Sequence, residues 1–294
     1  MRILLLCLIS LLAACQSRYV APPPAPIAPQ GRDHADFGVI RELATGRTLT
    51  PQALVERLAA APRVLVGEQH DNPDHHALQL WLLRQLAAQR PQGSLLMEML
   101  NPDQQANVDA AQAATRAGQP PADPYQALSW QAHWDWGVYG AVVTYALGQP
   151  YPLLSANLDR KQIMQIYKQR PTLNGEASTS EQVQATLLED IRESHCGLLP
   201  ETQMPAMLAV QQQRDRRMAE RLMAAPTPAL LLAGSFHVRK DLGVPLHMKD
   251  LGAGEGNAVL VLAEAGRTVS ADSADYAWYT AAQPEQDHCA DMRR

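Results

Sequence analysis

The chain has 294 residues, with 25 Lys and Arg side chains against 30 Asp and Glu, and its formal net charge at pH 7 is −5. Its basic residues do not cluster, so the electrostatic footprint of a nucleic-acid-binding protein is missing and we exclude nucleic acid as a partner. The part from Asp33 to Arg294 is about 260 residues long, which suits a single α/β domain that carries an insertion.

The first residues have the order of a secretory signal peptide. Arg2 is followed by the mostly apolar residues 3–12, and then by small residues that end in Cys15. The apolar run is about ten residues, whereas a helix needs roughly 20 to span a bilayer. The tetrapeptide Leu-Ala-Ala-Cys that ends there resembles a bacterial lipobox, which implies removal of residues 1–14 and lipidation of Cys15. Gln16 follows instead of Asp, and by the usual sorting rule for such lipoproteins this implies the outer membrane.

A proline-rich segment links this site to the expected fold. Residues 16–32 contain Pro22, Pro23, Pro24, Pro26 and Pro29 among alanines, with no regular apolar period. This composition predicts an extended segment of the polyproline type. We therefore expect residues 15–32 to be a lipidated tether, and residues 33–294 to form one α/β domain.

Two of the four cysteines remain available for a disulfide. Cys7 would leave with the signal peptide and Cys15 would carry lipid, so Cys196 and Cys289 are left for an oxidising compartment to pair. We expect a Cys196–Cys289 disulfide. The chain has no CxxC pair, no CxxCH motif for covalent haem and no zinc-finger spacing.

Short apolar runs alternate with helical patterns along the chain. Thr50-Pro51 predicts the N-cap and first position of a helix. The run 63–67 (RVLVG) is typical of a buried parallel strand, Asn72 begins the next helix, and the run 94–100 (SLLMEML) is a second buried strand. This βαβ order predicts a parallel sheet with right-handed crossovers.

The remaining elements continue this order. Residues 115–135 break the period with Gly, Pro and polar residues, which predicts a long loop or an inserted subdomain near 115–150. Further helices are expected after Asn101 and over about 136–148, 159–169, 180–194 and 202–225, and further strands over 151–157, 228–234 and 257–265. The predicted fold class is α/β, with a mostly parallel central sheet flanked by helices and a helical or loop insertion.

Polar side chains follow four of the predicted strands. Glu68, His70 and Asp71 follow the first, Glu98 lies at the end of the second, Asn157 follows the third, and Ser235 and His237 follow the fourth. Since ligands of open α/β sheets bind outside the carboxyl ends of the strands, we expect these groups around one pocket. The alternative is that loops are polar wherever they occur.

Glu98 and the neighbouring histidines lead to different expectations. Glu98 interrupts an apolar run, where a carboxylate facing the core needs a partner. His75 shares the helical stripe of Leu78 and is expected to face the sheet edge, whereas His76 points about 100° away and is expected to be a packing residue. His70 and His75 are not at the spacing of the HExxH pair of a zincin.

The helix expected over 202–225 carries charges on its apolar side. Its stripe of Leu208, Gln211, Asp215, Met218 and Leu222 is apolar except for Gln211 and Asp215, and Arg214 borders it. A core-facing stripe does not bury a carboxylate without a partner. Arg214 and Asp215 therefore either reach the rim of the pocket or form a buried structural ion pair.

Aromatic residues gather in and after the insertion. They are Trp130, Trp134, Trp136, Tyr139 and Tyr145. Together with Met97, Met99 and Tyr125 they are able to line a flat apolar cofactor. The alternative is ordinary core packing.

Taken together, these stretches resemble the ChaN family of haem-binding lipoproteins. The matching pieces are, in order, LVGEQHDNPDHH, LLMEM, SWQAHWDWGVY, SAN, ESHCG, AVQQQRDRRMAE, AGSFHVRKDLGVP and DYAWYT. The resemblance implies bacterial haem and iron uptake, a lipid anchor and a homodimer, in a fold shared with erythromycin-esterase and TIKI-like proteins. In such hydrolases a Glu and a His after one strand act with a later His. Glu68, His70 and His237 match those positions, and Glu98 matches the carboxylate after the second strand.

Two hypotheses of different classes follow from the resemblance. In the first, the protein captures haem non-covalently and passes it to a receptor or transporter; a Tyr or His takes the iron, and Arg or His meets the propionates. In the second, Glu68, His70, Glu98 and His237 hydrolyse an ester, amide or lactone, or hold a divalent metal for that reaction. We prefer haem, because a lipid anchor and an aromatic and methionine patch suit a surface carrier.

The residues expected to bind haem are Tyr139, His75, Met97, Met99 and Arg214. Anionic oxygen of Tyr suits ferric iron, and Tyr139 is our expected ligand. Spacing alone does not select it, so Tyr145, Tyr276 and His133 remain alternatives.

Overall fold

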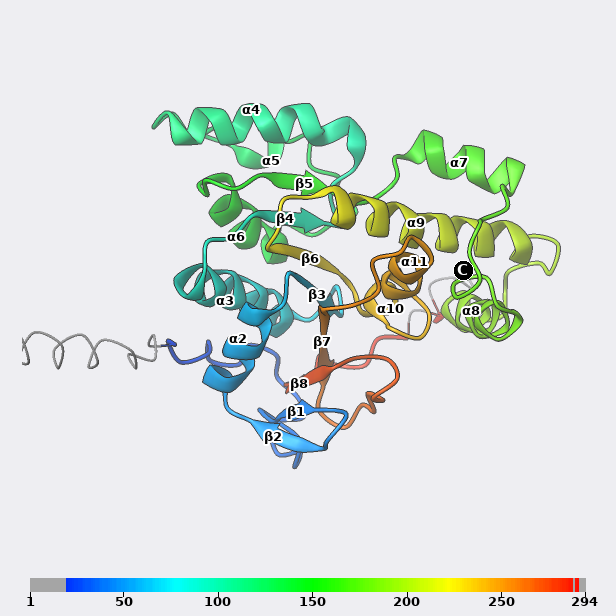
Figure 1. Ribbon diagram of the computed structural model, residues 1–294, viewed down its shortest axis with the longest axis horizontal. Coiled ribbons are helices and arrows are strands. Elements are labelled where there is room, and N and C mark those ends of the chain that lie inside the picture. Colours follow the sequence, from blue (N-terminus) through cyan, green and yellow to red (C-terminus); the bar gives the residue numbers. More distant parts are fainter. Residues whose placement is uncertain (1–19, 288, 291–294) are drawn as a thin grey trace, which may run out of the picture.

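The protein is described here by a computed structural model that covers residues 20–287 and 289–290. A single eight-stranded sheet, in the order β2-β1-β8-β7-β3-β6-β4-β5, carries helices on both faces (Figure 1). The strands are β1 (Ile40–Glu42), β2 (Arg47–Leu49), β3 (Arg63–Glu68), β4 (Ser94–Met97), β5 (Leu153–Ser155), β6 (Ala229–Gly234), β7 (Asn257–Glu264) and β8 (Tyr276–Thr280). The helices are α2 (Pro51–Ala60), α3 (Pro73–Gln89), the 3-10 turn η1 (Pro102–Gln104), α4 (Gln105–Arg116), α5 (Pro124–Ala127), α6 (Trp136–Leu147), α7 (Arg160–Gln169), α8 (Glu181–Ser194), α9 (Met204–Ala224), α10 (Ser235–Val238) and α11 (Val244–Asp250).

The expected fold class is confirmed. β3 to β7 match the five predicted apolar runs, and they pair in parallel, with β3 between β6 and β7. The sequence did not predict β1, β2 and β8; β8 is parallel to β7, and β1 is antiparallel to both of its neighbours. β1 and β2 have three residues each, which is too short to show an alternating period.

Local sequence accounts for the helix starts. Thr50 caps α2 by accepting a hydrogen bond from the N–H of Ala53, and Asn72 caps α3 by accepting one from Asp74. The expected insertion is largely irregular over 117–135 and contains only the short α5. α10 and α11 were missed, because four and seven residues are too few for a helical period.

Alternation along the strands divides the core into two layers. In β3, Val64 and Val66 belong to the apolar cluster that includes residues of α2, α3, α4 and α6. Leu65 belongs to the cluster on the opposite face, with residues of α9, α10 and α11. Successive side chains of a strand point to opposite faces, so Glu68 at the end of β3 faces the α3 layer.

Gly67 brings α10 close to the sheet on the other face. A Cβ at Gly67 would lie 2.4 Å from Val238 Cγ2 and 2.9 Å from the Cα of Ser235. Such distances are shorter than real contacts, so only glycine permits this approach. The result is that α10 and its His237 lie directly against the carboxyl end of β3.

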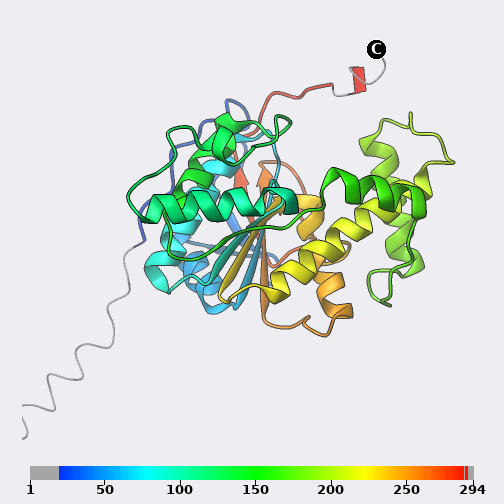
Figure 2. The ribbon, with the colours of Figure 1, turned by 90° about the horizontal axis from the view of Figure 1, so that it is seen from above.

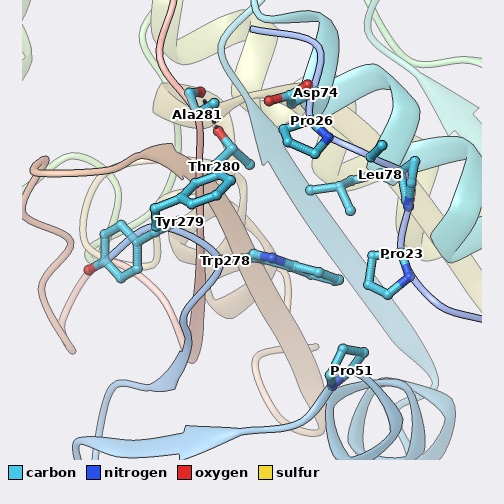
Figure 3. A pocket seen from close by; sticks show the side chains of 13 residues that line it. Pro23, Pro26, Pro51, Asp74, Leu78, Trp278, Tyr279, Thr280 and Ala281 are labelled. Carbon is cyan, nitrogen blue, oxygen red and sulfur yellow. Dashed lines mark hydrogen bonds between the residues drawn. The ribbon is translucent and has the colours of Figure 1, made fainter. Parts of the chain in front are cut away.

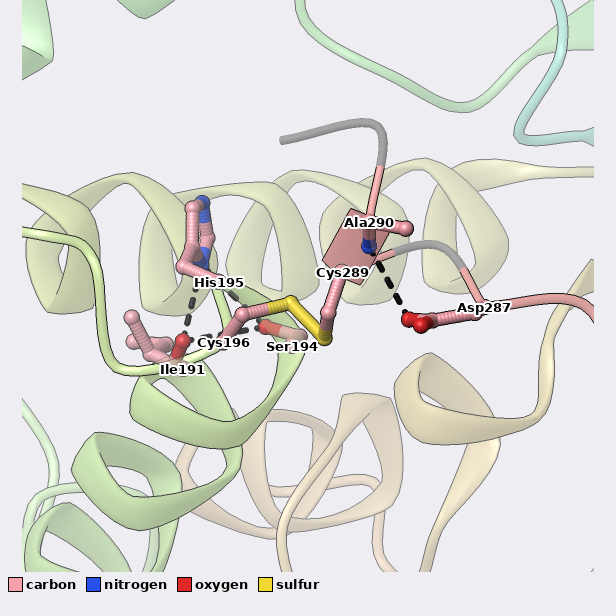
Figure 4. Close-up of a disulfide and its surroundings, with 7 residues drawn as sticks. All are labelled: Ile191, Ser194, His195, Cys196, Asp287, Cys289 and Ala290. Atoms are coloured by element: carbon pink, nitrogen blue, oxygen red, sulfur yellow. Dashed lines mark hydrogen bonds between the residues drawn. A yellow bond between two sulfur atoms is a disulfide. The ribbon is translucent and has the colours of Figure 1, made fainter. Parts of the chain in front are cut away.

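A helical lobe extends the α9 layer. Val183, Leu187 and Ile191 of α8 pack against Met204 and Leu208 of α9. Figure 2 shows α8 at one side of the body. Cys196, just after α8, forms the expected disulfide with Cys289, with a Cα–Cα distance of 5.6 Å (Figure 4). The disulfide joins this lobe to the segment that follows β8.

The expectation of a free tether up to residue 32 is wrong for residues 21–30, which lie against the domain. The N–H of Ala21 donates to Gln85 Oε1 at 3.0 Å, and Trp81 Nε1 donates to the carbonyl of Ala21 at 3.0 Å. Asp74 Oδ1 accepts hydrogen bonds from Ile27 and Ala28. Gln30 forms a β-bridge with Ala282. The prolines explain why the sequence shows no apolar period here. The backbone N–H and C=O groups of this segment nevertheless form hydrogen bonds with the domain.

Residues 1–19, with the expected signal peptide and Cys15, lie outside the described residues. Within residues 20–287 and 289–290, no helix is long and apolar enough to cross a membrane.

Removal of the docked segment tests its contribution to stability. A soluble form of the chain that begins at Asp33 is expected to be about 2 kcal/mol less stable than one that begins at Val20, because several hydrogen bonds of about 1 kcal/mol each are lost, partly offset by chain entropy. Urea unfolding followed by circular dichroism measures this difference. Equal unfolding midpoints would show that the segment contributes nothing.

Candidate functional site

The carboxyl ends of β3, β4, β5 and β6 lie together at one edge of the sheet, beside α9 and α10. The side chains gathered there, which we call the rim, are Glu68, His70, Glu98, Asn157, Arg214 and His237. Several are in direct contact, as the strand order predicted. The rim contains two halves, each built around one buried carboxylate.

Glu68 forms the half that faces α3 and α6. It is 1% exposed; its Oε1 accepts from the Tyr139 hydroxyl at 2.5 Å and lies 2.9 Å from His70 Nδ1. Its Oε2 accepts from Gln79 Nε2 at 2.5 Å and lies 3.1 Å from His76 Nδ1. Burial alone would raise the pKa of Glu68, but hydrogen bonds from His70 and His76 outweigh it and lower this pKa to about 2. Glu68 is therefore ionised at neutral pH, with both oxygens engaged.

Glu98 forms the half that faces α9. Its Oε1 lies 2.6 Å from Arg214 Nη2 and 3.2 Å from His237 Nε2, and its Oε2 accepts from the N–H of Gly234 at 2.8 Å. His237 Nδ1 is in turn 2.5 Å from Asp215 Oδ1. Two carboxylates and two cations thus form a closed, charge-balanced network.

His237 is held in its charged form by this network. Burial lowers the pKa of His237, but the charges of Glu98 and Asp215 outweigh burial and raise it to about 9. Burial also disfavours the ionised form of Glu98, yet His237 and Arg214 keep the pKa of Glu98 well below its usual value. Both ring nitrogens of His237 are therefore donors, so the ring lacks a lone pair for base catalysis or metal binding.

His70 is different, because it is only half-buried. Its side chain is 43% exposed, Nδ1 is held by Glu68, and its ring lies 4.9 Å from that of Trp134 in an edge-on arrangement. Among the described residues, Nε2 of His70 has no hydrogen-bond partner. Burial lowers the pKa of His70, but the hydrogen bond that it donates to Glu68 and the charge of Glu98 raise this pKa overall. His70 is thus the rim group with a free ring nitrogen directed away from its carboxylate partner.

An apolar cavity adjoins His70. It has a volume of about 180 Å³. Its apolar lining comes from Leu187, Ile191, Phe236 and Leu242, and its polar lining comes from His70, Asp190, Ser194, Gln211 and His237, together with Gly234. Phe236 is 58% exposed although it is a large apolar side chain. The rim therefore combines a free imidazole nitrogen with an apolar wall.

The expectation that Met97 and Met99 line a cofactor is wrong. Both are 0% exposed and belong to the core cluster of the α3 layer. They alternate with Glu98, so they point to the face opposite the Glu98 network.

His75 and His76 exchange their expected roles. His75 is 0% exposed; its Nδ1 accepts from the N–H of Gln69, its Nε2 lies 3.0 Å from Thr280 Oγ1, and burial lowers its pKa to about 3. His75 is therefore a neutral packing residue and is not placed to bind haem. His76 instead contacts Glu68. His76 and Gln79 are three residues apart and so lie on the same face of α3. This spacing could have predicted that both contact Glu68, but it was overlooked.

Tyr139 is not placed as an iron ligand. It is 1% exposed and its hydroxyl donates to Glu68. Burial and the charge of Glu68 raise the pKa of Tyr139, which disfavours the phenolate. Of the alternatives, Tyr145 lies under the guanidinium of Arg84, and Tyr276 packs against the core. His133 is exposed beside Trp134, with a ring separation of 5.0 Å.

Most of the aromatic patch is core packing. Trp130 and Trp136 contact each other edge to face, and Trp130 also lies against Tyr139. Two residues of the patch contact His70: Trp134 packs edge-on against its ring, and the Tyr139 hydroxyl lies 3.1 Å from His70 Nδ1. The patch therefore supports the rim from beneath and does not form a flat cofactor wall.

Arg214 and Asp215 both reach the rim, but they do not pair with each other. Arg214 contacts Glu98, and its Nε donates to Asn157 Oδ1 at 3.1 Å; Asp215 holds His237. The guanidinium of Arg214 is thus already engaged, which makes it a poor partner for a haem propionate.

A metal centre at the rim finds no support in the geometry. Within the described part of the chain, no group of three or more His, Cys, Asp and Glu residues has an arrangement that suits a metal ion. A metal at Glu68 or Glu98 would have to displace the hydrogen bonds and ion pairs that neutralise them.

The fold and rim define an α/β protein with a candidate ligand site at the carboxyl ends of its parallel strands. A family profile described as haem-binding uptake, Tiki superfamily, ChaN, matches residues 54–248. The match covers more than half of the chain, so the protein belongs to this ChaN family, as its motifs indicated.

One solved structure agrees with this assignment. The structure reported as cofacial heme binding to ChaN of Campylobacter jejuni has a TM-score of 0.74 and 29% identity, and the match covers 81% of this chain and 95% of that one. An erythromycin esterase in its open conformation has a TM-score of 0.46 and 12% identity, with 78% of each chain covered. A search of curated proteins gives no match.

The charge of His237 predicts a pH dependence of stability. Its folded pKa of about 9 exceeds the ordinary 6.5, so its contribution is fully present below pH 6.5 and is lost as the pH rises through 9. We expect the unfolding free energy to fall by about 3 kcal/mol over this window. Urea unfolding at several pH values measures it. Asp215→Asn should shift the loss to lower pH; a pH-independent free energy in the unmodified chain would contradict the charged state.

Gly234 is expected to be required for the position of His70. A Cβ at Gly234 would lie 2.9 Å from Cε1 and Nε2 of His70, so Gly234→Ala should displace the ring from Glu68. The pKa of His70, raised by Glu68, should then move toward its ordinary value in an NMR titration of the ring nitrogens. Gly148→Ala is the control, since its Cβ would lie at an ordinary 3.6 Å from Tyr145 O. An unchanged His70 titration in Gly234→Ala would contradict this role.

Proposed function

We propose that this protein binds haem non-covalently at the rim and, anchored by lipid on Cys15, takes part in haem and iron uptake. Membership of a haem-binding family supports the ligand class. The observation that carries the site is the free Nε2 of His70, on a half-exposed ring fixed by Glu68 beside an apolar cavity.

His70 has the surroundings of a histidine that would hold a metal ion. Metal-bound histidines commonly donate their second ring N–H to a carboxylate, which fixes the tautomer and makes the ligating nitrogen more basic. Glu68 is 2.9 Å from His70 Nδ1 and is ionised. The edge of Trp134 restrains the ring from the side. These contacts leave Nε2 as the donor that would meet ferric iron.

The apolar lining of the cavity suits a flat, hydrophobic ligand. Leu187, Ile191 and Leu242 line the cavity beside His70, and exposed Phe236 stands at its edge. The cavity of about 180 Å³ is below the roughly 300–1,000 Å³ that encloses a small molecule. The cavity would therefore hold only part of a haem, and the exposed Phe236 would supply further apolar contact.

The outer-membrane anchor and the uptake role rest on the sequence. The signal-like residues 1–14 and the lipobox-like cysteine imply export and lipidation. A disulfide between Cys196 and Cys289 is consistent with an oxidising compartment.

Hydrolysis is the second candidate, and the same residue would carry it. The His70–Glu68 pair has the arrangement of a general base held by a carboxylate. His237 is unsuited to the role of base because both of its nitrogens are donors, and the lowered pKa values of Glu68 and Glu98 make them weak bases. The two functions are therefore separable by assay, although they share His70.

Haemin titration of a soluble chain that begins at Val20 tests the proposal. We expect a saturable shift of the Soret band with one haem per chain. His70→Ala should weaken binding by about tenfold or more, equivalent to about 1.4 kcal/mol, because the axial bond is lost. His34→Ala is the matched control, since it removes an exposed imidazole next to Asp36 and outside the rim.

Two further variants examine the ligand. His133→Ala tests the exposed imidazole beside Trp134, and Tyr145→Phe tests the half-buried phenol of one of the alternative ligands. If either variant, and not His70→Ala, removes the Soret shift, the assignment of His70 is wrong. If free haemin's spectrum persists at micromolar protein while the chain cleaves model esters in a His70-dependent manner, the hydrolase hypothesis replaces haem binding.

A further inference from the structure

The docked segment of residues 21–30, which we call the strap, lies along α3. At one end, Ala21 is held by Gln85, and Trp81 Nε1 donates to the carbonyls of both Ala21 and Pro22 at 3.0 Å. At the other end, Asp74 accepts from the N–H groups of Ile27 and Ala28. Figure 3 shows Pro23 and Pro26 beside Leu78 of α3, near Asp74. The strap therefore runs antiparallel to α3 over most of its length.

α3 crosses the domain from one end of the sheet to the other. It starts shortly after Glu68, at the carboxyl end of β3, and finishes just before Ser94, at the amino end of β4. Eleven residues separate Asp74 from Gln85, which corresponds to about 16 Å along a helix. Ala21 thus lies at the amino ends of the strands, opposite the rim. In Figure 1 the blue start of the strap lies at the left, and α10 and α8 lie at the right.

The strap is well held. Asp74 is 5% exposed, Trp81 7% and Ala28 0%, so their hydrogen bonds are shielded from water. Beyond Ala28, the bridge between Gln30 and Ala282 ties the strap to the chain after β8. Prolines favour the extended backbone in advance, which reduces the entropy lost on docking.

We propose that the strap orients this protein on a lipid bilayer, with the amino ends of the strands toward the lipid headgroups and the rim directed away from them. The inference rests on the proposed lipid anchor at Cys15. From Cys15 to Ala21 there are six residues, which span at most about 20 Å. A free tether as far as Asp33 would span about 60 Å and would allow the rim to reach the bilayer. The docked strap removes that freedom.

The orientation defines which partner has access to the haem site. A ligand at the rim faces the aqueous compartment, so haem would be exchanged with a soluble carrier or with a receptor domain that stands off the membrane. Direct exchange of haem with the lipid beneath the protein is disfavoured.

Labels at the two ends of β7 test this orientation in the full lipidated chain. Glu255 precedes β7 and Arg267 follows it, and both are exposed. Since Cys196 and Cys289 are paired, a single Glu255→Cys or Arg267→Cys provides one thiol for a fluorophore. The labelled protein is reconstituted into vesicles of phosphatidylethanolamine and phosphatidylglycerol that contain a nitroxide-headgroup lipid, and quenching is measured.

We expect the label at position 255 to be quenched at least about twofold more than the label at 267, because the strand places them roughly 26 Å apart. A flexible Gly-Ser segment inserted before Val20 lengthens the chain between Cys15 and the strap and should reduce this difference. The Trp81→Phe/Gln85→Leu variant, which loses the hydrogen bonds that hold Ala21, should reduce it as well.

Flotation with the vesicles provides a separate readout of the anchor. If the chain floats but both labels are quenched equally, or the 267 label more strongly, the orientation is wrong and the anchor stands. If the chain does not float, the anchor and the orientation both fail, while haemin binding by the soluble chain is unaffected.

Discussion

The rim depends on the neutralisation of two buried carboxylates. An isolated ion moved into a protein interior costs several kcal/mol, so Glu68 and Glu98 each require cations and donors within contact distance. Glu98 is satisfied by Arg214, His237 and a backbone N–H, which together engage both of its carboxylate oxygens. Glu68 is satisfied in part by His70, whose ring bonds through one nitrogen only. The same electrostatic requirement therefore engages the charged groups that contact Glu98. Around Glu68 it leaves His70 Nε2 without a hydrogen-bond partner among the described residues.

The two-residue period of the strands explains which parts of the site the sequence could predict. The apolar runs predicted strands β3 to β7, and the polar residues at the ends of these runs predicted the site residues Glu68, Glu98, Asn157 and His237. Applied one step further, the same alternation would have placed Met97 and Met99 on the face opposite Glu98, in the core. The polar positions of α9 were informative because a carboxylate on an apolar stripe needs a partner, and Asp215 has one in His237.

Other features were beyond local sequence patterns. α3 is buried on more than one side, so its stripe did not distinguish His75 from His76; the distinction depends on Tyr139 and Glu68 meeting across the sheet edge. The strap was missed because a proline-rich composition describes backbone conformation and not its docking partner. Its hydrogen bonds go to Asp74, Trp81 and Gln85, residues more than forty positions away. β1 depends on pairing with β8, and β2 on pairing with β1, which no three-residue pattern reveals.

The start of the strap and the candidate haem site lie at opposite ends of the parallel strands. The strap brings the start of the described chain to the amino ends of the strands, whereas the imidazole of His70 and the apolar cavity lie at the carboxyl ends.

Electron–nuclear double resonance of the ferric haem complex, with nitrogen-15 introduced only at histidine, tests most directly the central claim that His70 binds the haem iron. The account predicts one histidine nitrogen coupled to the iron, lost in His70→Ala. A spectrum without histidine coupling, or one unchanged in that variant, would contradict it.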